Sequence, residues 1–368
     1  MEQTAQKLRA VPKEVKECKM LLLGFGNVGQ AFAQMCLDKA SFGHGVRFVF
    51  IGVVTGAHGF TYQGGRPLDM AQILSLYASS LPQEVDLCAF GTGDWPAAKV
   101  LDVASTLRLI AESGADVVVE AVPVNYDTGE PALSFLRKAL ECGMHGISAN
   151  KGPVVHGFHD LSALAASRGK RYLFESAVMD GVPVFSLWRN LPGACLKGFR
   201  GVLNSTTNVI LTAMEDGLTF ERALQMAQAA GIAEADPAGD IDGWDAAVKV
   251  AALCTVLMDV PIKVTDVQRE GISSLTQQQV EAAAAEGQRY KLMCSAQVEP
   301  SGQVVSQVRL EKLTSADSPF FDLPGPSSAL QIYTDVLAPV TIVSSDPTTK
   351  DTAYGIFGDC LTAMLEQT

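Results

Sequence analysis

A glycine-rich turn between a short apolar segment and a helical segment restricts the fold of this chain most. Residues 19–23, KMLLL, predict a buried strand, and GFGNVG follows directly at 24–29. The next eleven residues, QAFAQMCLDKA, have the apolar spacing of a helix. A G-x-G-x-x-G turn at such a strand-to-helix junction is the fingerprint of a dinucleotide-binding βαβ unit. The N-terminal part of the chain is therefore predicted to be a Rossmann domain.

Each glycine of this turn has a separate task. Gly24 permits the tight turn, Gly26 lets the backbone approach a pyrophosphate, and Gly29 lets the helix pack closely on the strand. The N-terminus of that helix then faces the anion. A second buried strand, expected over 117–123, would bring its C-terminal end to the same site. The predicted cofactor-binding residues are Gly24, Phe25, Gly26, Asn27, Val28, Gly29, Ala121, Val122 and, farther along the chain, Lys151.

The strand expected at 46–54, VRFVFIGVV, leaves the choice between NAD and NADP open. An acidic residue at its end would bind the ribose hydroxyls of NAD, but TGAHG follows. An arginine could accommodate the phosphate of NADP, but none comes before Arg66. Either dinucleotide is therefore compatible with the sequence.

A lysine lies where the next strand should end. A helix is expected over 130–143, and a short strand follows within GISANKGP (146–153). Lys151 then lies at the carboxyl end of that strand, where open α/β sheets bind their ligands. A loop lysine can also simply be solvated, but this position favours a ligand role. A further helix is expected over 160–168.

A second lysine stands alone in the other half of the chain. Five carboxylates occur from Glu234 to Asp245, and Lys249 follows within a segment that is otherwise apolar on every side. Asp245 and Lys249 are four residues apart, so they share one face of the expected helix. A helix that is apolar all round is buried. Burial lowers the pKa of a lysine and a carboxylate raises it, so we expect Lys249 to exchange a proton near neutral pH.

Charge and residue placement exclude several other classes of protein. The net charge of −12 does not suit binding to nucleic acid or to an anionic membrane, and no apolar run is long enough to span a bilayer. The eight cysteines are scattered without a C-x-x-C pair, which is typical of reduced thiols in the cytoplasm. The acidic loop has D-x-D spacing at Asp240 and Asp242, so it can bind either a metal or the ammonium group of a substrate.

Six blocks of the sequence resemble homoserine dehydrogenases of the short form, which lacks a regulatory ACT domain. In the family's order they are GFGNVG, GEPALSFLRKALECG, SANKGP, GVLNSTTNVIL, GIAEADPAGDIDGWDAAVK and DVQREGI. The most specific is the spacing E-x10-D-x3-K, which Glu234, Asp245 and Lys249 meet. The resemblance implies an α/β fold with an N-terminal Rossmann domain and an α+β domain for substrate binding and dimerisation.

With the expected elements, the resemblance divides the chain into four parts. We expect a polar lead-in over 1–17, the NAD(P)-binding Rossmann domain over 18–152 and the substrate-binding and dimerisation domain over 153–340. The C-terminal segment over 341–368 would return to the nucleotide domain. The expected assembly is a cytoplasmic homodimer that takes a small-molecule substrate and has no nucleic-acid or membrane partner.

The resemblance implies reversible, NAD(P)-dependent oxidation of homoserine to aspartate semialdehyde, a step of the aspartate pathway to threonine and methionine. Lys249 would exchange the alcohol proton, Asp245 would orient it, and Lys151 would assist near the hydroxyl and the cofactor. The implied substrate-binding residues are Glu234, Asp240, Ser205 and Thr206. A sodium site of the family maps onto Glu175, Val178, Asp180 and Val182.

Four departures from the family pattern border the predicted cleft. Ile232 replaces the aromatic residue before the acidic loop, and Ser205 replaces the glycine of an N-G-T-x-N turn. Met179 and Asp180 change a glycine-rich stretch, and SSDPTTKDTA (344–353) replaces a G-x-G-A-G turn. The departures favour a divergent homoserine enzyme or the same chemistry on a different small hydroxy acid. A nucleotide-binding sensor without catalysis is a third interpretation, which the two lysines oppose.

Overall fold

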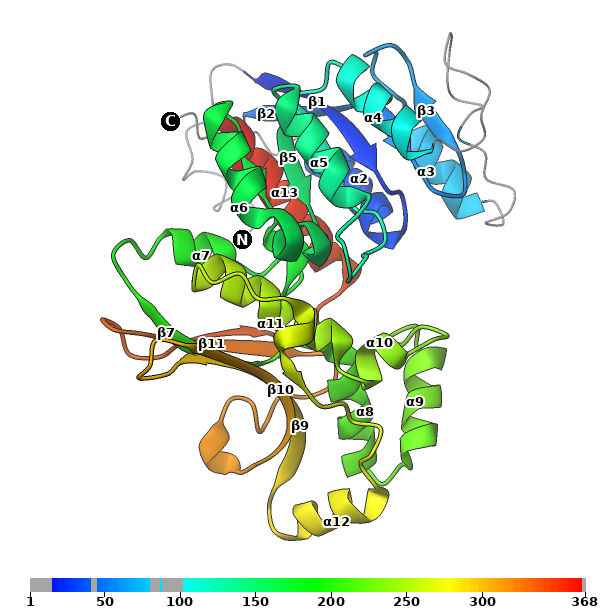
Figure 1. The fold of residues 1–368 in the computed structure, drawn as a ribbon. Coiled ribbons are helices and arrows are strands. Elements are labelled where there is room, and N and C mark those ends of the chain that lie inside the picture. The colour runs from blue at the N-terminus through cyan, green and yellow to red at the C-terminus, as the bar shows by residue number, and fades with distance from the viewer. Residues whose placement is uncertain (1–14, 41–44, 80–86, 88–101, 366–368) are drawn as a thin grey trace, which may run out of the picture.

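The computed structural model describes residues 15–40, 45–79, 87 and 102–365 of the 368-residue chain. The chain forms two halves, and a six-stranded sheet with helices builds each of them (Figure 1). Most of the polar lead-in expected over 1–17 lies outside the described residues. Within the described residues, no helix is both long and apolar enough to cross a membrane.

Sheet A builds the first half with the strand order β3-β2-β1-β4-β5-β6. Its strands are β1 (Lys16–Leu23), β2 (Val46–Val54), β3 (Phe60–Tyr62), β4 (Val117–Glu120), β5 (His145–Ser148) and β6 (Tyr172–Leu173). Neighbouring strands run parallel, except that β3 is antiparallel to β2. Parallel strands need crossover connections, which place helices on both faces. The predicted α/β fold with a Rossmann unit is confirmed.

Helices cover the two faces of sheet A. They are α2 (Asn27–Asp38), α3 (Met70–Ser79), α4 (Val103–Glu112), α5 (Ala132–Glu141), α6 (Lys151–Ser167) and α13 (Thr349–Leu365). Helix α5 packs between α4 and α6, whereas α2 packs between α3 and α13. The last helix of the chain thus shares a core with the helix after the glycine turn, as the red and blue ribbons of Figure 1 show.

Two strands begin or end at different residues from those that the apolar pattern predicts. β1 begins at Lys16 rather than at residue 19, because Lys16 and Glu17 join the ladder with β2 although their side chains are exposed. β4 ends at Glu120 rather than at residue 123. A strand is defined by its backbone pairing, and apolar side chains mark only the part that is buried.

Helix α6 begins earlier than expected, at Lys151 and not near residue 160. The side chain of Asn150 accepts a hydrogen bond from the backbone N–H of Gly152 at 2.9 Å and caps the helix. Pro153 is tolerated in the first turn, where its missing N–H has no partner within the helix. Lys151 is therefore the first residue of a helix, at the carboxyl edge of sheet A.

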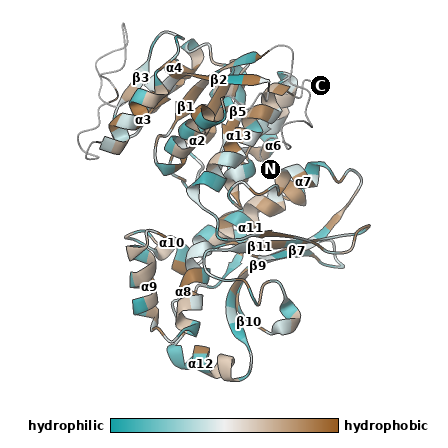
Figure 2. Cartoon of the chain, turned by 180° about the vertical axis from the view of Figure 1, so that it is seen from behind, coloured by the Kyte–Doolittle hydropathy of each residue, from teal (hydrophilic) through white to brown (hydrophobic). Residues whose placement is uncertain are grey.

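Sheet B builds the second half with the strand order β12-β11-β7-β9-β10-β8. Its strands are β7 (Leu196–Val202), β8 (Gln268–Arg269), β9 (Arg289–Val298), β10 (Val304–Leu313), β11 (Ser328–Thr334) and β12 (Val340–Ser344). Only β8 and β10 pair in parallel among these described strands. In β10, VVSQVRLEKL, polar and charged residues occur among apolar ones, and teal segments mark them in Figure 2. This sheet is thus less completely covered than sheet A.

The helices of the second half include one that lies between the two halves. They are α7 (Phe185–Arg189), α8 (Ser205–Glu215), α9 (Phe220–Ala229), α10 (Ala238–Ile241), α11 (Trp244–Leu257) and α12 (Gln277–Ala285). Helix α11 packs on α6 of the first half and on β9 and β10 of the second. Its residues from Ala246 onward are almost all buried, as its apolar composition predicts. Gly243 begins this helix with a φ of 80°, which favours glycine.

Candidate active site

A cavity of about 1040 Å³ lies at the carboxyl edge of sheet A. The residues predicted to bind the cofactor, from the glycine turn and from the segment after β4, all line it. It also includes Thr55 to His58 after β2, and Glu234 from the second half. Open α/β sheets bind nucleotides at this edge. Lys151, the remaining residue predicted to bind the cofactor, does not line this cavity.

The three glycines of the turn have different surroundings. A Cβ on Gly24 would lie 2.2 Å from the carbonyl oxygen of Ala121, and one on Gly29 would lie 2.4 Å from that of Gly24. These two positions exclude a side chain because backbone approaches backbone. A Cβ on Gly26 would meet nothing within 4 Å and would point into open space. A pyrophosphate fits there, against Gly26 and the N-terminus of α2.

A smaller cavity, of about 250 Å³, lies between the two halves. It shares Val28, Ala121 and Val122 with the larger cavity, so the two are adjacent. Lys151 and Lys249 both line the smaller cavity. The fold thus brings the two lysines from different helices to one place beside the predicted cofactor site.

Asp245 lies between these two lysines. One carboxylate oxygen is 2.8 Å from Lys249 Nζ, and the other is 3.4 Å from Lys151 Nζ. All three side chains are largely buried. Asp245 and Lys249 lie on successive turns of α11, as their spacing predicts. Asp180 also lines the smaller cavity, so two ammonium groups and two carboxylates lie close together there and balance in charge.

Two of the three N–H donors of the Lys249 ammonium have partners within the protein. One donates to Asp245, and another donates to the carbonyl oxygen of Leu203 at 2.6 Å. No described residue accepts a hydrogen bond from the third N–H, which therefore remains for a group in the cavity that Lys249 lines. The protein thus fixes the nitrogen and presents one proton to a ligand.

The charges around Lys249 determine its protonation. Burial lowers the pKa of Lys249, but the charge and hydrogen bond of Asp245, together with the charges of Asp180 and Asp240, outweigh burial and raise the pKa. Burial raises the pKa of Asp245, but Lys249 and Lys151 hold it well below its usual range. The pair is therefore an ammonium and a carboxylate at neutral pH. The prediction that Lys249 exchanges a proton near neutral pH is wrong for the free protein, because the neighbouring carboxylates together outweigh the effect of burial on its pKa.

Asn204 connects the lysine pair to the acidic loop. Its side-chain amide donates to Asp240 at 2.7 Å and to Asp245 at 3.0 Å. Its side-chain oxygen accepts from the backbone N–H of Thr207 and caps α8. Burial, and then the charge of Asp245, raises the pKa of Asp240. Asn204 is not among the predicted residues, although an asparagine before a helix is a recognised capping signal.

Known proteins with this architecture identify the family. A family model described as homoserine dehydrogenase matches residues 183–361. An NAD(+)-dependent homoserine dehydrogenase from Pseudomonas canavaninivorans is 35% identical over 94% of this chain and 96% of its own length. A homoserine dehydrogenase from Sulfurisphaera tokodaii is 30% identical, over 93% of this chain and 97% of its own. A hyperthermophilic archaeal homoserine dehydrogenase mutant in complex with NADPH has a TM-score of 0.77 and 26% identity, covering 95% of this chain and 98% of that one.

The chain belongs to the homoserine dehydrogenase family. It is an NAD(P)-dependent oxidoreductase that acts on the alcohol group of homoserine, as the resemblance of its motifs predicts. The other two interpretations, a different hydroxy acid and an inactive sensor, are not favoured, because relatives over nearly the full length are homoserine dehydrogenases.

The residues that the family resemblance assigns to homoserine lie in two places. Ser205 and Thr206 form the first turn of α8, next to Asp240 and the lysine pair. Thr206 Oγ1 also donates to the carbonyl oxygen of Ile232 at 3.3 Å. Glu234 is exposed and lines the larger cavity instead. The structure therefore brings Asp240 to the Lys249–Asp245 pair through Asn204, with Ser205 and Thr206 directly after that asparagine, and leaves Glu234 on the cofactor side.

Tyr126 lies close to the acidic groups, although the sequence gives no sign of it. It follows β4 in the first half of the chain. Burial raises the pKa of its hydroxyl, and the charges of Asp245, Asp240 and Glu234 add to the rise. An aromatic hydroxyl thus approaches the acids from the other half, although Ile232 has replaced the aromatic residue of the family. Only the tertiary structure brings this tyrosine to the acidic loop.

The side chains of the sodium set have partners within the protein. The Glu175 carboxylate accepts hydrogen bonds of 2.7 and 2.8 Å from two backbone N–H groups at the start of α7. Asp180 accepts one of 3.0 Å from Thr352. Among the described residues, no group of three histidine, cysteine, aspartate or glutamate residues could hold a metal ion. Both oxygens of Glu175 and one oxygen of Asp180 therefore have hydrogen-bond partners within the protein.

Proposed function

We propose that Lys249 donates and accepts the proton of the C4 oxygen of homoserine. The observation that carries this role is its third N–H, which the protein leaves for the cavity. In oxidation, the neutral amine of Lys249 removes the hydroxyl proton; in reduction, the ammonium returns a proton to the aldehyde oxygen. Asp245 holds the nitrogen in place, and Lys151 adds a second positive charge beside the reacting oxygen.

The cofactor would meet the substrate where the two cavities adjoin. NAD(P)+, when bound, accepts the hydride that leaves C4 as the alcohol becomes an aldehyde. Ala121 and Val122 line both cavities and would form the wall at which the two ligands meet. Gly26 and the N-terminus of α2 would hold the pyrophosphate. These positions support proton transfer and hydride transfer at one place.

We infer that Asp240 and Glu234 bind the ammonium end of homoserine. Burial and repulsion from the neighbouring carboxylate Asp245 raise the pKa of Asp240. An ammonium group bound beside Asp240 would offset this repulsion and stabilise the charged carboxylate. Thr206 lies on the same side and can bind the polar end of the substrate. Glu234 approaches from the cofactor side. A hydroxy acid without an amine would leave these carboxylates without a partner.

We infer further that NAD is preferred over NADP. In the described wall of the larger cavity there is no lysine or arginine, whereas Glu234 belongs to it. The 2′-phosphate of NADP is a dianion that binds best to such cations. Thr55 uses its hydroxyl on the carbonyl oxygen of Gly59. The preference would therefore arise from poor binding of the 2′-phosphate. We expect kcat/KM for NAD to exceed that for NADP by at least about tenfold.

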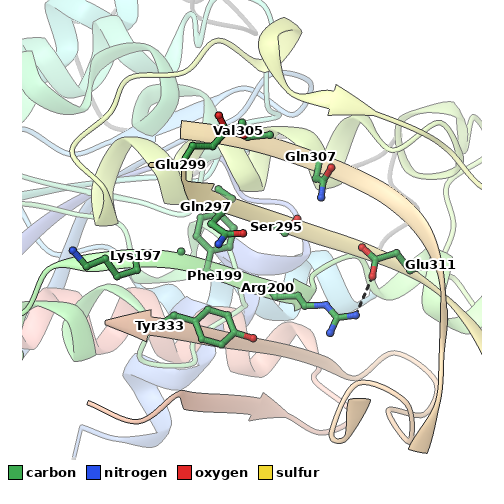
Figure 3. A pocket seen from close by; sticks show the side chains of 12 residues that line it. Lys197, Phe199, Arg200, Ser295, Gln297, Glu299, Val305, Gln307, Glu311 and Tyr333 are labelled. Atoms are coloured by element: carbon green, nitrogen blue, oxygen red, sulfur yellow. Dashed lines mark hydrogen bonds and ion pairs between the residues drawn. The ribbon is translucent and has the colours of Figure 1, made fainter. Parts of the chain in front are cut away.

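We propose that the protein forms a homodimer through sheet B. A pocket of about 550 Å³ hollows one face of this sheet. Figure 3 shows Gln307, Arg200 and Tyr333 on three of its strands, β10, β7 and β11. Val336, in the turn between β11 and β12, is an apolar side chain that is 65% exposed. A hollowed sheet with exposed apolar residues beside it supports contact with a second copy. Light scattering during gel filtration measures the mass directly.

A substrate panel tests the proposed reaction. The absorbance of the reduced cofactor at about 340 nm gives kcat/KM for homoserine, for larger amino alcohols and for hydroxy acids without an amine. We expect homoserine to exceed every analogue by more than about tenfold, which corresponds to roughly 1.4 kcal/mol of transition-state binding. Faster turnover of the amine-free acids would contradict the role of Asp240 and Glu234. Faster turnover of larger amino alcohols would mean that the sequence departures at the cleft have changed the preferred substrate.

A further inference from the structure

A carboxyl group without a counter-ion lies directly beneath the two cavities. Glu120 is the last residue of β4 and is completely buried. In the described residues no lysine, arginine or histidine forms an ion pair with it. Burial raises the pKa of Glu120 to about 7, against the hydrogen bonds from Ser148, Val122 and Asn150. Buried carboxyl groups without a cation are costly, so this position calls for an explanation beyond packing.

Three donors converge on the Glu120 carboxylate. One oxygen accepts from the hydroxyl of Ser148 at 2.6 Å. The other accepts from the backbone N–H of Val122 at 2.8 Å and from the side-chain amide of Asn150 at 3.3 Å. The Ser148 oxygen also accepts from the backbone N–H of Asn150 at 3.0 Å. All of these partners lie on the two segments that leave the sheet beside Glu120.

The location of these bonds matters because two strands separate there. Glu120 and Ser148 are the last paired residues of β4 and β5. Beyond them, one segment runs through Ala121 and Val122, which line both cavities, and the other runs into α6. The Asn150 side chain spans the gap, since it donates to the carbonyl oxygen of Val122 at 3.3 Å and also caps α6. The distance between the two segments therefore depends on this cluster.

We propose that Glu120 is a positioning residue that sets the place of Lys151 relative to the cofactor wall at Val122. It acts through Asn150, which begins the helix that presents Lys151 to Asp245 at 3.4 Å. The N-terminus of α6 also faces negative charge favourably, so the buried carboxylate and the helix stabilise each other. Glu120 itself lines neither cavity. The proposal rests on the role given to Lys151 above.

The test compares Glu120→Ala with Glu120→Gln in steady-state kinetics. An amide can still accept from Val122 and Asn150 and can donate to Ser148, so Gln should restore most of the rate. Misplacement by about 1 Å can lower a rate on the order of 10²-fold, and we expect that loss in kcat for Glu120→Ala. KM for homoserine should change by less than about threefold, because the ammonium site is elsewhere. The primary isotope effect of homoserine deuterated at C4 should rise as the chemical step slows.

A control at the other end of the same strand separates positioning from stability. Asp116 precedes β4, and its carboxylate accepts a hydrogen bond of 2.8 Å from the backbone N–H of Lys19. Asp116→Ala therefore also removes a carboxylate acceptor from this sheet, but away from the cavities. It should lower the melting temperature and leave kcat and the isotope effect unchanged. Ser148→Ala, which removes the 2.6 Å bond to Glu120 and the 3.0 Å bond from the backbone N–H of Asn150, serves if Glu120→Ala does not fold, and should lower kcat by about tenfold.

The pathway through Lys151 is tested by a double-mutant cycle. In a Lys151→Ala background, Glu120→Ala should lower kcat by less than about threefold further. An equal loss in both backgrounds, or a folded Glu120→Ala enzyme with nearly unchanged kcat, would overturn the proposal. Full activity of Lys151→Ala alone would instead contradict the proposed function. The two failures are therefore distinguishable.

Discussion

Two buried lysines in the second half of the molecule have opposite surroundings. Lys249 on α11 contacts the carboxylate of Asp245 at 2.8 Å. Lys291 on β9 is only 1% exposed and donates to neutral oxygens, Asn208 Oδ1 at 2.8 Å and the Leu323 carbonyl at 2.9 Å. Burial lowers the pKa of Lys291, and Glu215 offsets this only in part, whereas Asp245 raises the pKa of Lys249 above its ordinary value. Burial by itself therefore does not determine what a lysine does.

The two lysines also differ in what they reach. Lys249 lines the small cavity with Lys151, whereas Lys291 is not part of that cavity's wall. Lys291 instead joins α8 to the segment around Leu323, where Asn208 also donates to the carbonyl oxygens of Leu323 and Gly325. Lys249 thus has a donor left for a ligand, and Lys291 uses its charge to hold two segments together. The comparison predicts that one lysine serves catalysis and the other stability.

The largest expected effect is on turnover when Lys249 is replaced. Lys249→Ala should lower kcat by about 10²–10⁴, because a positioned proton donor and acceptor is lost. The dissociation constant of NAD, followed by fluorescence titration, should stay nearly unchanged, since Lys249 does not line the larger cavity. A variant that keeps near-wild-type turnover would remove Lys249 from the reaction and end the contrast with Lys291.

The next effect is on stability when Lys291 is replaced. Lys291→Ala leaves two buried oxygen atoms without that donor, and we expect a loss of about 3 kcal/mol in the free energy of unfolding. That corresponds to roughly a hundredfold in the unfolding equilibrium constant. Below the melting temperature, kcat should remain within about twofold of the wild type. Urea unfolding followed by circular dichroism measures the loss, and a large drop in kcat at unchanged stability would make the two lysines alike.

A smaller effect distinguishes the two directions of the reaction as pH changes. Lys249 faces Asp245, Asp180 and Asp240, which raise its pKa, and Lys151 lies on the other side of Asp245. Oxidation needs the neutral amine, so its initial rate should rise by about tenfold per pH unit above neutrality. Reduction uses the ammonium and should stay flat over the same range. Asp245→Asn should move the rise to lower pH, and an unmoved profile would assign the titration to another group.

The smallest effect is the contribution of Lys291 to stability as pH changes. The pKa of Lys291 in the folded protein is below the ordinary value of 10.5. Between these two pKa values, the unfolded chain therefore binds more protons at this lysine than the folded protein does. Stability from this group should therefore rise as pH rises toward 10.5. We expect less than about 1 kcal/mol between pH 8 and 10, measured as the difference between the wild type and Lys291→Met. A difference of the opposite sign would mean that Lys291 is stabilised as an ammonium, like Lys249.

The sequence predicts those parts of the site that depend on local spacing. The glycine turn between a strand and a helix places Gly24, Gly26 and Gly29, and each has the surroundings that its task requires. The four-residue spacing of Asp245 and Lys249 puts them on one face of α11, where they form an ion pair. Such patterns can be read from the sequence because the period of a helix and the geometry of a turn do not depend on distant residues.

Only the tertiary structure decided which distant groups meet and how their charges balance. Lys151 reaches Asp245 across the two halves, and Asn204 joins Asp245 to the acidic loop. The direction of the shift in the pKa of Lys249 followed from direct contact, since burial and a carboxylate act in opposite senses and only their distances decide between them. The sequence predicts Glu120 only as one residue of a buried strand, because hydrogen bonds between neighbouring strands leave no pattern in a single sequence.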